Sequence, residues 1–143
     1  VLNDRPDLAA ELGADGVHVG QDDASVASAR ALLGHEAIVG LSTHAEPELD
    51  AGLLEPVTYL SAGPVTPTPT KPGREGTGLG YATYATQHSS VPVFVTGGVT
   101  PALVPSLVEA GVRHFVVVRY LTEAADPKAA AAQLRRAISE LVS

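Results

Sequence analysis

The 143-residue sequence contains no cysteine, methionine or tryptophan, and only four tyrosines and two phenylalanines. Without cysteine, disulfides and thiolate metal sites are excluded, so the chain needs no oxidising compartment and we expect it in the cytoplasm. Nine basic residues against 16 acidic ones give a net charge of -7. Because stacking aromatics are few and the chain has no excess of positive charge, we expect neither nucleic acid nor a membrane surface as a partner. The apolar runs are also too short to span a bilayer.

The beginning of the chain is unusual, because residue 1 is valine. Residues 1–4 have the pattern of the end of a strand, and a helical pattern follows at once from residue 5 to residue 12. We therefore expect a fragment of a longer chain. Its length predicts one domain over residues 1–143. The oligomeric state stays open, and a homo-oligomer is compatible with the sequence.

Apolar runs and helical patterns alternate along the rest of the chain. The runs are residues 16–19, 37–41, 57–61, 91–96 and 114–118, and the helical patterns are residues 24–33, 46–54, 81–87, 101–110 and 127–142. Strands rich in Val, Ile and Leu are typical of a parallel sheet that is covered on both faces, so the pattern predicts an α/β protein.

Two parallel architectures fit this alternation, a doubly wound sheet and a (β/α)8 TIM barrel. The dinucleotide and P-loop glycine motifs typical of the first do not occur. Polar residues follow every predicted strand, as they do on the catalytic face of a barrel. We therefore predict a (β/α)8 barrel that lacks its first strands, with five whole strands and the end of a sixth.

The polar residues at the strand ends are suited to phosphorylated ligands. Asp4 and Asp23 follow successive strands and can hold Mg²⁺, which commonly takes one or two carboxylates together with water and phosphate. Asn3 and Ser42 are neutral hydrogen-bonding groups for a heterocycle or a phosphate oxygen. Helix capping is the alternative role of both aspartates and of Ser42. His18, between two valines, is expected to be a partnered core histidine and not a ligand.

A loop without hydrophobic period, residues 61–75, follows the third apolar run. Its threonine hydroxyls and Lys71 are suited to an anion, although a lysine on a loop is usually just solvated. Further along, Gly97 and Gly98 precede a predicted helix that begins at Pro101. Bare amides near a helix start suit a phosphate monoester, and a simple turn is the alternative.

Together these segments resemble the thiamine-phosphate synthase family. The resemblance is carried by Asn-Asp-Arg at residues 3–5, Gly-Val-His-Val-Gly-Gln-Asp-Asp at 16–23, Gly-Leu-Ser-Thr-His at 40–44, Gly-Pro-Val-Thr-Pro-Thr-Pro-Thr-Lys-Pro-Gly at 63–73 and Gly-Gly-Val at 97–99. It implies a transferase that joins hydroxymethylpyrimidine diphosphate to hydroxyethylthiazole phosphate and releases pyrophosphate.

The resemblance also implies a role for each matching residue. Asp4 and Asp23 would bind Mg²⁺, and Asn3, Ser42 and Lys71 the pyrimidine diphosphate, with Lys71 and Ser42 as the catalytic candidates. The thiazole phosphate would be bound by Thr68, Pro69, Thr70, Gly98, Val118 and Arg119. The family often has a small polar residue where Arg119 stands, and its Gln-x-Arg-x-Lys strand end, which grips the diphosphate, has no match here. The resemblance therefore also predicts that the 143-residue chain alone has little or no activity.

Two alternatives stay open. A thiazole tautomerase, an isomerase on the same barrel, needs a general base but no diphosphate clamp. A phosphate-binding remnant without catalysis is the other alternative. The two aspartates and the Thr-x-Thr-Lys segment favour the synthase.

Overall fold

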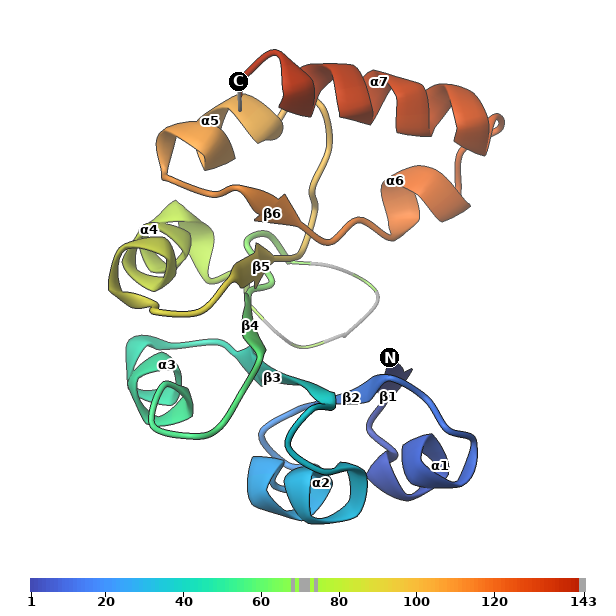
Figure 1. Ribbon diagram of the computed structural model, residues 1–143. Coiled ribbons are helices and arrows are strands. Elements are labelled where there is room, and N and C mark those ends of the chain that lie inside the picture. The colour runs from blue at the N-terminus through green and yellow to red at the C-terminus, as the bar shows by residue number, and fades with distance from the viewer. Residues whose placement is uncertain (68, 70–72, 74, 142–143) are drawn as a thin grey trace. The chain divides into compact units, whose positions relative to one another are not determined.

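The computed structural model describes residues 1–67, 69, 73 and 75–141 (Figure 1). Its strands are β1 (Leu2–Asn3), β2 (Gly16–Val19), β3 (Ile38–Thr43), β4 (Tyr59–Ala62), β5 (Val93–Val95) and β6 (His114–Phe115). Its helices are α1 (Pro6–Glu11), α2 (Val26–Leu33), α3 (Glu46–Gly52), α4 (Gly78–His88), α5 (Val104–Glu109), α6 (Arg119–Thr122) and α7 (Pro127–Ser139).

The six strands form one sheet whose order follows the chain, β1 to β6. The pairs β1–β2, β2–β3 and β5–β6 are parallel. Strands and helices alternate, as expected for β/α units of the (β/α)8 barrel class. The chain divides into two compact units, residues 1–61 with 89–92 and residues 62–88 with 93–143. A single barrel domain over residues 1–143 stays a prediction.

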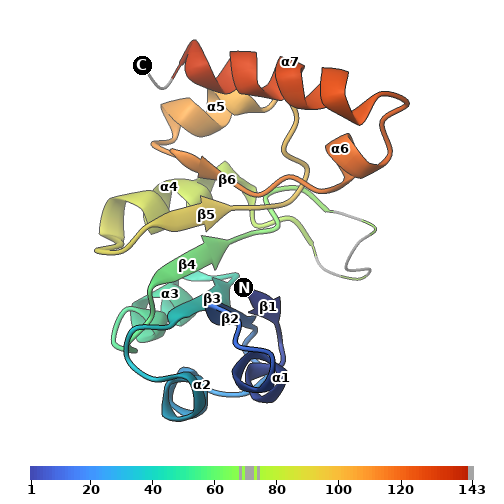
Figure 2. The same cartoon turned by 45° about the vertical axis from the view of Figure 1, so that its right-hand side comes forward.

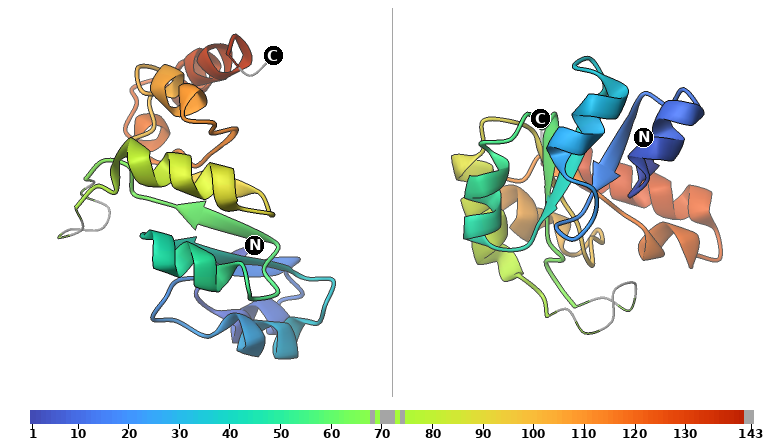
Figure 3. Two further views of the ribbon diagram at one scale, coloured as in Figure 1. Left: turned by 90° about the vertical axis from the view of Figure 1, so that its left-hand side faces the viewer. Right: turned by 90° about the horizontal axis from the view of Figure 1, so that it is seen from below.

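In the first unit, helix starts are set by local sequence. Pro6 opens α1, where a missing amide hydrogen costs no intrahelical bond. Ser25 caps α2, its side chain accepting a hydrogen bond from the amide of Ser28 at 3.1 Å. Helices α1 and α2 lie side by side (Figures 1 and 3).

The core of the first unit lies beneath these helices and α3. Val17, Val19 and Val39 are fully buried, as are Leu49 of α3 and Leu60 of β4. Since alternate residues of a strand point to opposite faces, the residues between these valines point to the other face of the sheet.

In the second unit, α4 packs beside β5 and α5, and α5 packs against α7 (Figure 2). Asp126 caps α7 by accepting a hydrogen bond from the amide of Ala129 at 2.9 Å, and Pro127 is its first residue. Val95, Val104, Leu107 and Val112 form the fully buried core.

The predicted strands and helices are confirmed, with shorter bounds at most ends. The prediction for the fourth helical segment was wrong at its start, because Pro101 lies in a turn and α5 begins only at Val104. The amides of Leu103 and Val104 both bond to the carbonyl of Thr100, which holds that turn ahead of the helix. Helix α6 was not predicted. Over the described residues, no helix is long and apolar enough to cross a membrane.

Candidate functional site

The sheet of the first unit has a polar face opposite the helices. His18 pairs in register with Asn3 on β1 and with Gly40 on β3. Two residues after Gly40, Ser42 points to the same face, and Tyr59 of β4 extends to His18. The face thus combines hydroxyl, imidazole and amide groups, all able to bond a polar ligand.

Ser42, His18 and Tyr59 form one chain of hydrogen bonds across three strands. The Nε2 atom of His18 is 2.8 Å from Oγ of Ser42, and its Nδ1 atom is 2.8 Å from the hydroxyl of Tyr59. The two rings also stack, with centroids 5.4 Å apart. His18 is therefore a partnered histidine, as predicted. Burial raises the pKa of the Tyr59 hydroxyl, so this group keeps its proton at neutral pH.

Gly40 makes room for the ring of Tyr59. A Cβ atom at Gly40 would overlap Cζ and the hydroxyl of Tyr59. The glycine thus lets an aromatic ring from β4 lie over β3 and reach His18 on β2. Tyr59 was not predicted as a site residue, and the only signal for it was a polar aromatic within the predicted strand at residues 57–61.

Further bonds hold Ser42 in place. Its backbone carbonyl accepts from Nε2 of Gln21 at 2.7 Å, and its Oγ atom accepts from Oγ of Ser61 at 3.4 Å. Helix α3 is capped at Ala45 without a side-chain bond, so the alternative that Ser42 caps this helix is wrong. The nearby His44 bonds to helix α3, since its Nδ1 atom lies 2.9 Å from Oε2 of Glu48.

Both predicted metal-binding aspartates are exposed and follow adjacent parallel strands. Asp4 has a left-handed backbone, with φ 62°, and its amide donates to the carbonyl of His18 at 2.8 Å. The Oδ2 atom of Asp23 accepts from the amide of Gly20 at 2.8 Å, which fixes the turn after β2. Neither aspartate is the N-cap of a helix, because the caps of α1 and α2 are Arg5 and Ser25.

In the second unit, the two ends of the predicted ligand loop are bonded together. The carbonyl of Pro64 accepts from the amide of Thr77 at 2.7 Å and from its hydroxyl at 3.2 Å, and the amide of Gly78 donates to the carbonyl of Val65 at 3.0 Å. Val65 in turn donates its amide to the carbonyl of Thr96 at 2.8 Å. Backbone bonds therefore fix where the loop leaves the protein.

Gly97 and Gly98 pack directly on this anchor. Both have positive φ, 93° and 73°, and a Cβ atom at Gly98 would overlap Oγ1 of Thr66. At Gly97 a Cβ atom would lie 2.5 Å from Cα of Pro64. The double glycine is thus more than a solvent-exposed turn, because it allows the loop base and the turn after β5 to approach closely.

Some predicted ligand residues fall outside the described part of the chain. These are Thr68, Thr70 and Lys71. Pro69 between them lies in an exposed turn. Their roles stay predictions.

Val118 and Arg119 mark the start of α6, where Val118 is the N-cap residue. Arg119 makes two bonds to Glu123, from Nε to Oε1 at 2.7 Å and from an Nη atom to Oε2 at 2.8 Å. The bonds from Arg119 lower the pKa of the Glu123 carboxyl. The guanidinium is therefore occupied by a carboxylate in this structure.

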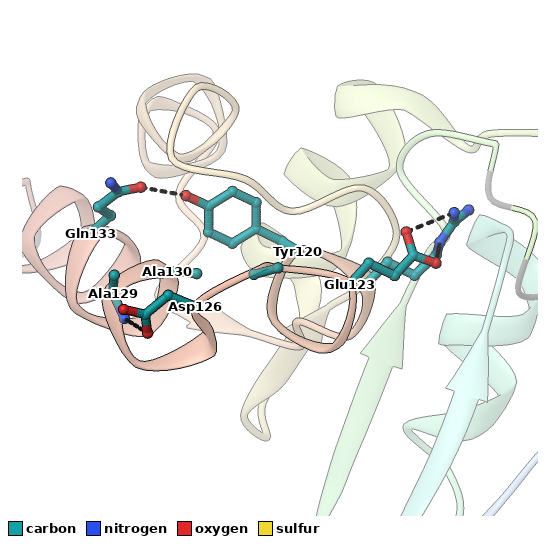
Figure 4. A pocket seen from close by; sticks show the side chains of 8 residues that line it. Tyr120, Glu123, Asp126, Ala129, Ala130 and Gln133 are labelled. Carbon is teal, nitrogen blue, oxygen red and sulfur yellow. Dashed lines mark hydrogen bonds and ion pairs between the residues drawn. The ribbon is translucent and has the colours of Figure 1, made fainter.

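A surface pocket of about 430 Å³ lies between α6 and α7 (Figure 4). Its polar groups bond mainly to one another: Arg119 with Glu123, and the hydroxyl of Tyr120 with Oε1 of Gln133 at 2.8 Å. Asp126 in its wall is occupied in capping α7. The pocket therefore has few hydrogen-bonding groups left to bind a ligand.

Over residues 1–121, the chain matches the family model described as thiamine monophosphate synthase. It is 45% identical over 138 residues to thiamine-phosphate synthase of Mycobacterium sp. (strain JLS), covering 96% of this chain and 61% of the relative. It is 48% identical over 135 residues to thiamine-phosphate synthase of Thermus thermophilus, covering 94% of this chain and 65% of the relative. The chain thus spans less than two thirds of the length of these relatives.

The structure resembles thiamine phosphate pyrophosphorylase from Pyrococcus furiosus, with a TM-score of 0.88 and 26% identity over 99% of this chain and 67% of the other. It also resembles 3-hexulose-6-phosphate synthase, with a TM-score of 0.68 and 29% identity over 94% of this chain and 67% of the other. The family expected from the sequence motifs is confirmed: the chain belongs to the thiamine monophosphate synthase family.

Proposed function

We propose that this chain provides most of the active site of a thiamine-phosphate synthase, which joins hydroxymethylpyrimidine diphosphate to hydroxyethylthiazole phosphate. The observation that carries the proposal is the polar sheet edge of the first unit. There, Asn3 pairs in register with His18, which bonds to Ser42, while Asp4 follows β1 directly and Asp23 lies in the turn after β2. Together with the matched family, this donor set is suited to a diphosphate on a nitrogen heterocycle.

Mg²⁺ fits the residues at this edge. Among the described residues, no cluster of three or more His, Asp or Glu side chains could hold a metal by itself. Two carboxylates suffice for Mg²⁺, which keeps several waters and takes further ligands from substrate phosphate. The bond from Gly20 uses only one oxygen of Asp23 and holds that carboxylate in place. When bound, Mg²⁺ would neutralise the charge of the leaving pyrophosphate.

The residues of the chain have separate tasks in the proposed reaction. The carbon–oxygen bond to the diphosphate breaks first, and the thiazole nitrogen then forms the new carbon–nitrogen bond to the resulting pyrimidine cation. Asn3 and Ser42 would orient the pyrimidine diphosphate, and Lys71 would stabilise the departing negative charge. This mechanism needs no nucleophile from the protein.

The thiazole phosphate would be bound by the second unit. Gly98 brings a backbone without side chain to the loop base, and Thr68, Pro69 and Thr70 belong to the loop that this base anchors. Arg119, beside Val118, uses two of its N–H groups on Glu123, and releasing Glu123 would make the whole guanidinium available to the phosphate. That exchange would cost little, since ion pairs at exposed sites contribute little.

The tautomerase and the inactive remnant make different predictions. A tautomerase needs no Mg²⁺-dependent diphosphate site, and a remnant binds neither substrate. Small phosphorylated molecules are the expected partners in all active cases. The oligomeric state and the cytoplasmic location stay predictions.

Binding of the pyrimidine diphosphate, measured by calorimetry with and without Mg²⁺, tests the proposal on this chain. We expect Mg²⁺-dependent binding that Asp23→Asn weakens about tenfold, because an amide binds a hard cation more weakly than a carboxylate. Asp22→Asn is the matched control, since it removes an adjacent exposed charge and should change affinity less than about twofold. Binding that is independent of Mg²⁺ in the wild-type chain would contradict the proposal.

The role of Lys71 has its own test. Lys71→Ala should weaken diphosphate binding more than thiazole-phosphate binding, because the substitution removes the positive charge that is proposed to contact the diphosphate alone. Equal losses for the two ligands would argue against this role.

Pyrophosphate release by the 143-residue chain, compared with release by a full-length relative, measures how much activity the chain has alone.

A further inference from the structure

The hydrogen bonds around Ser42 determine more than its position, because they also determine where its proton points. A neutral imidazole has one donor and one acceptor nitrogen. His18 contacts a hydroxyl through each nitrogen, Tyr59 through Nδ1 and Ser42 through Nε2, both at 2.8 Å. Only two arrangements of protons satisfy both contacts, and they leave Ser42 in opposite states.

In one arrangement Tyr59 donates a hydrogen bond to His18, and His18 donates one to Ser42. The phenol donates to Nδ1, and the Nε2–H group donates to Oγ of Ser42. The hydroxyl proton of Ser42 is then directed away from His18, toward a ligand. In the other arrangement Ser42 donates to Nε2 and can only accept from a ligand.

Acidity favours the first arrangement. A phenol is a stronger hydrogen-bond donor than an alcohol, so Tyr59 outcompetes Ser42 for the acceptor nitrogen of the imidazole. The alcohol oxygen is also the better acceptor for the N–H group, because the lone pairs of a phenol are partly delocalised into its ring. Burial raises the pKa of Tyr59, but a phenol still remains far more acidic than the hydroxyl of a serine, so Tyr59 stays the stronger donor.

A weaker contact acts in the same sense. The hydroxyl of Ser61 donates to the same Oγ atom of Ser42 at 3.4 Å, which is longer than a strong O–H···O bond. Together with the bond from His18, it leaves the proton of Ser42 for a third partner. Gln21, through the carbonyl of Ser42, fixes the backbone that carries this hydroxyl.

We propose that Tyr59 and His18 are positioning residues that hold Ser42 as a hydrogen-bond donor, so that this site selects an acceptor atom of the ligand. The choice of ligand rests on the proposed function. On a pyrimidine diphosphate, the acceptors are the ring nitrogens and the phosphate oxygens, whereas the exocyclic amino group is excluded.

The tautomer of His18 tests this proposal without any ligand. Nitrogen NMR of the imidazoles, recorded at about pH 8.5 where an ordinary histidine is neutral, distinguishes Nε2–H from Nδ1–H. His18→Gln identifies the signal. We expect the Nε2–H form in the wild-type chain and a mixture of both forms in Tyr59→Phe. An Nδ1–H form in the wild-type chain would overturn the proposal.

Ligand binding provides the second readout. Tyr59→Phe keeps the ring but removes the hydroxyl, and we expect about fivefold weaker binding of the pyrimidine diphosphate with unchanged binding of the thiazole phosphate. Tyr120→Phe, which removes a phenol hydroxyl bonded to Gln133 in the other unit, is the matched control and should change neither affinity. Equal losses in both variants would overturn the positioning role.

The two tests separate this proposal from the proposed function. If the wild-type chain shows the Nε2–H form but binds no pyrimidine diphosphate, the proposed function fails for this chain while the orientation of Ser42 stands. If it binds that ligand with the Nδ1–H form, the function stands and the orientation is wrong.

Discussion

The two units position their candidate ligand groups by different means. In the first, side chains hold one another across strands, as in the chain from Tyr59 through His18 to Ser42. In the second, backbone bonds and closely packed glycines at residues 97 and 98 hold the base of a loop. The first unit should therefore be sensitive to changes of side-chain chemistry as well as to added volume at Gly40, whereas the loop base of the second unit should respond mainly to added volume.

The largest effect should come from Gly97→Ala in the second unit. The new Cβ atom would lie 2.5 Å from Cα of Pro64 and 2.7 Å from the amide nitrogen of Val65, so the backbone must move. We expect a loss of about 3 kcal/mol in the free energy of unfolding, measured in urea. Gly78→Ala is the control, because its φ is also positive but nothing lies near its Cβ position, and it should cost about 1 kcal/mol. Equal losses of stability in Gly97→Ala and Gly78→Ala would show that the positive φ alone causes the loss and that close packing at Gly97 does not contribute.

Gly40→Ala should be the largest perturbation of the site in the first unit. The methyl group would displace the ring of Tyr59 from His18, at a cost of about 2 kcal/mol. Urea unfolding measures the loss, and the NMR signal of His18 shows whether the contact is broken. Gly80→Ala, in α4 with open space around it, should instead stabilise by about 0.5 kcal/mol or more. An unchanged His18 signal in Gly40→Ala would show that the ring of Tyr59 does not depend on the missing side chain.

Arg30→Lys tests how much side-chain hydrogen bonds stabilise the first unit away from the candidate ligand groups. The guanidinium of Arg30 donates to the carbonyls of Pro56, His35 and Ala37 and to Oγ1 of Thr58. An ammonium group cannot make this planar set of bonds, so we expect a loss of about 1.5 kcal/mol in thermal unfolding.

Thr66→Ala in the second unit is the counterpart of Arg30→Lys in the first. Thr66→Ala removes only a 3.4 Å bond from Oγ1 of Thr66 to the carbonyl of Gly97, while the backbone bonds remain. It should cost about 0.5 kcal/mol. A loss as large as that of Arg30→Lys would mean that side chains hold the loop base as well.

The smallest effect is expected at the exposed ion pairs, where the two units should not differ. The bond from Arg5 lowers the pKa of Asp7 to about 2. Because the folded-state pKa is below the usual value, the pair contributes stability above about pH 4. That contribution is lost as the pH falls toward 2. Arg5→Gln should raise the pKa of Asp7 in a carbon NMR titration, with little change in stability at neutral pH. A large change at neutral pH would show that this exposed pair is structural.

The sequence predicted the alternation of strands and helices and the family, because apolar runs and turn residues are local signals. It also placed Asp4 and Asp23 in the segments that follow β1 and β2, and Ser42 near the end of β3. It could not show that Tyr59 reaches His18, since that contact joins residues 41 positions apart and depends on a missing side chain at Gly40. Nor could it show that Arg119 is paired with Glu123 in α6, because that helix has only four residues and no apolar period.

The bonds between Pro64 and Thr77 have a consequence for how this chain can vary. Once both ends of a loop are fastened, lengthening it costs only loop-closure entropy, about 0.6 kcal/mol for each doubling of its length. Insertions between Pro67 and Gly76 should therefore be tolerated by the fold. The segment proposed to touch the ligand can thus be exchanged while the anchors keep its entry and exit in place.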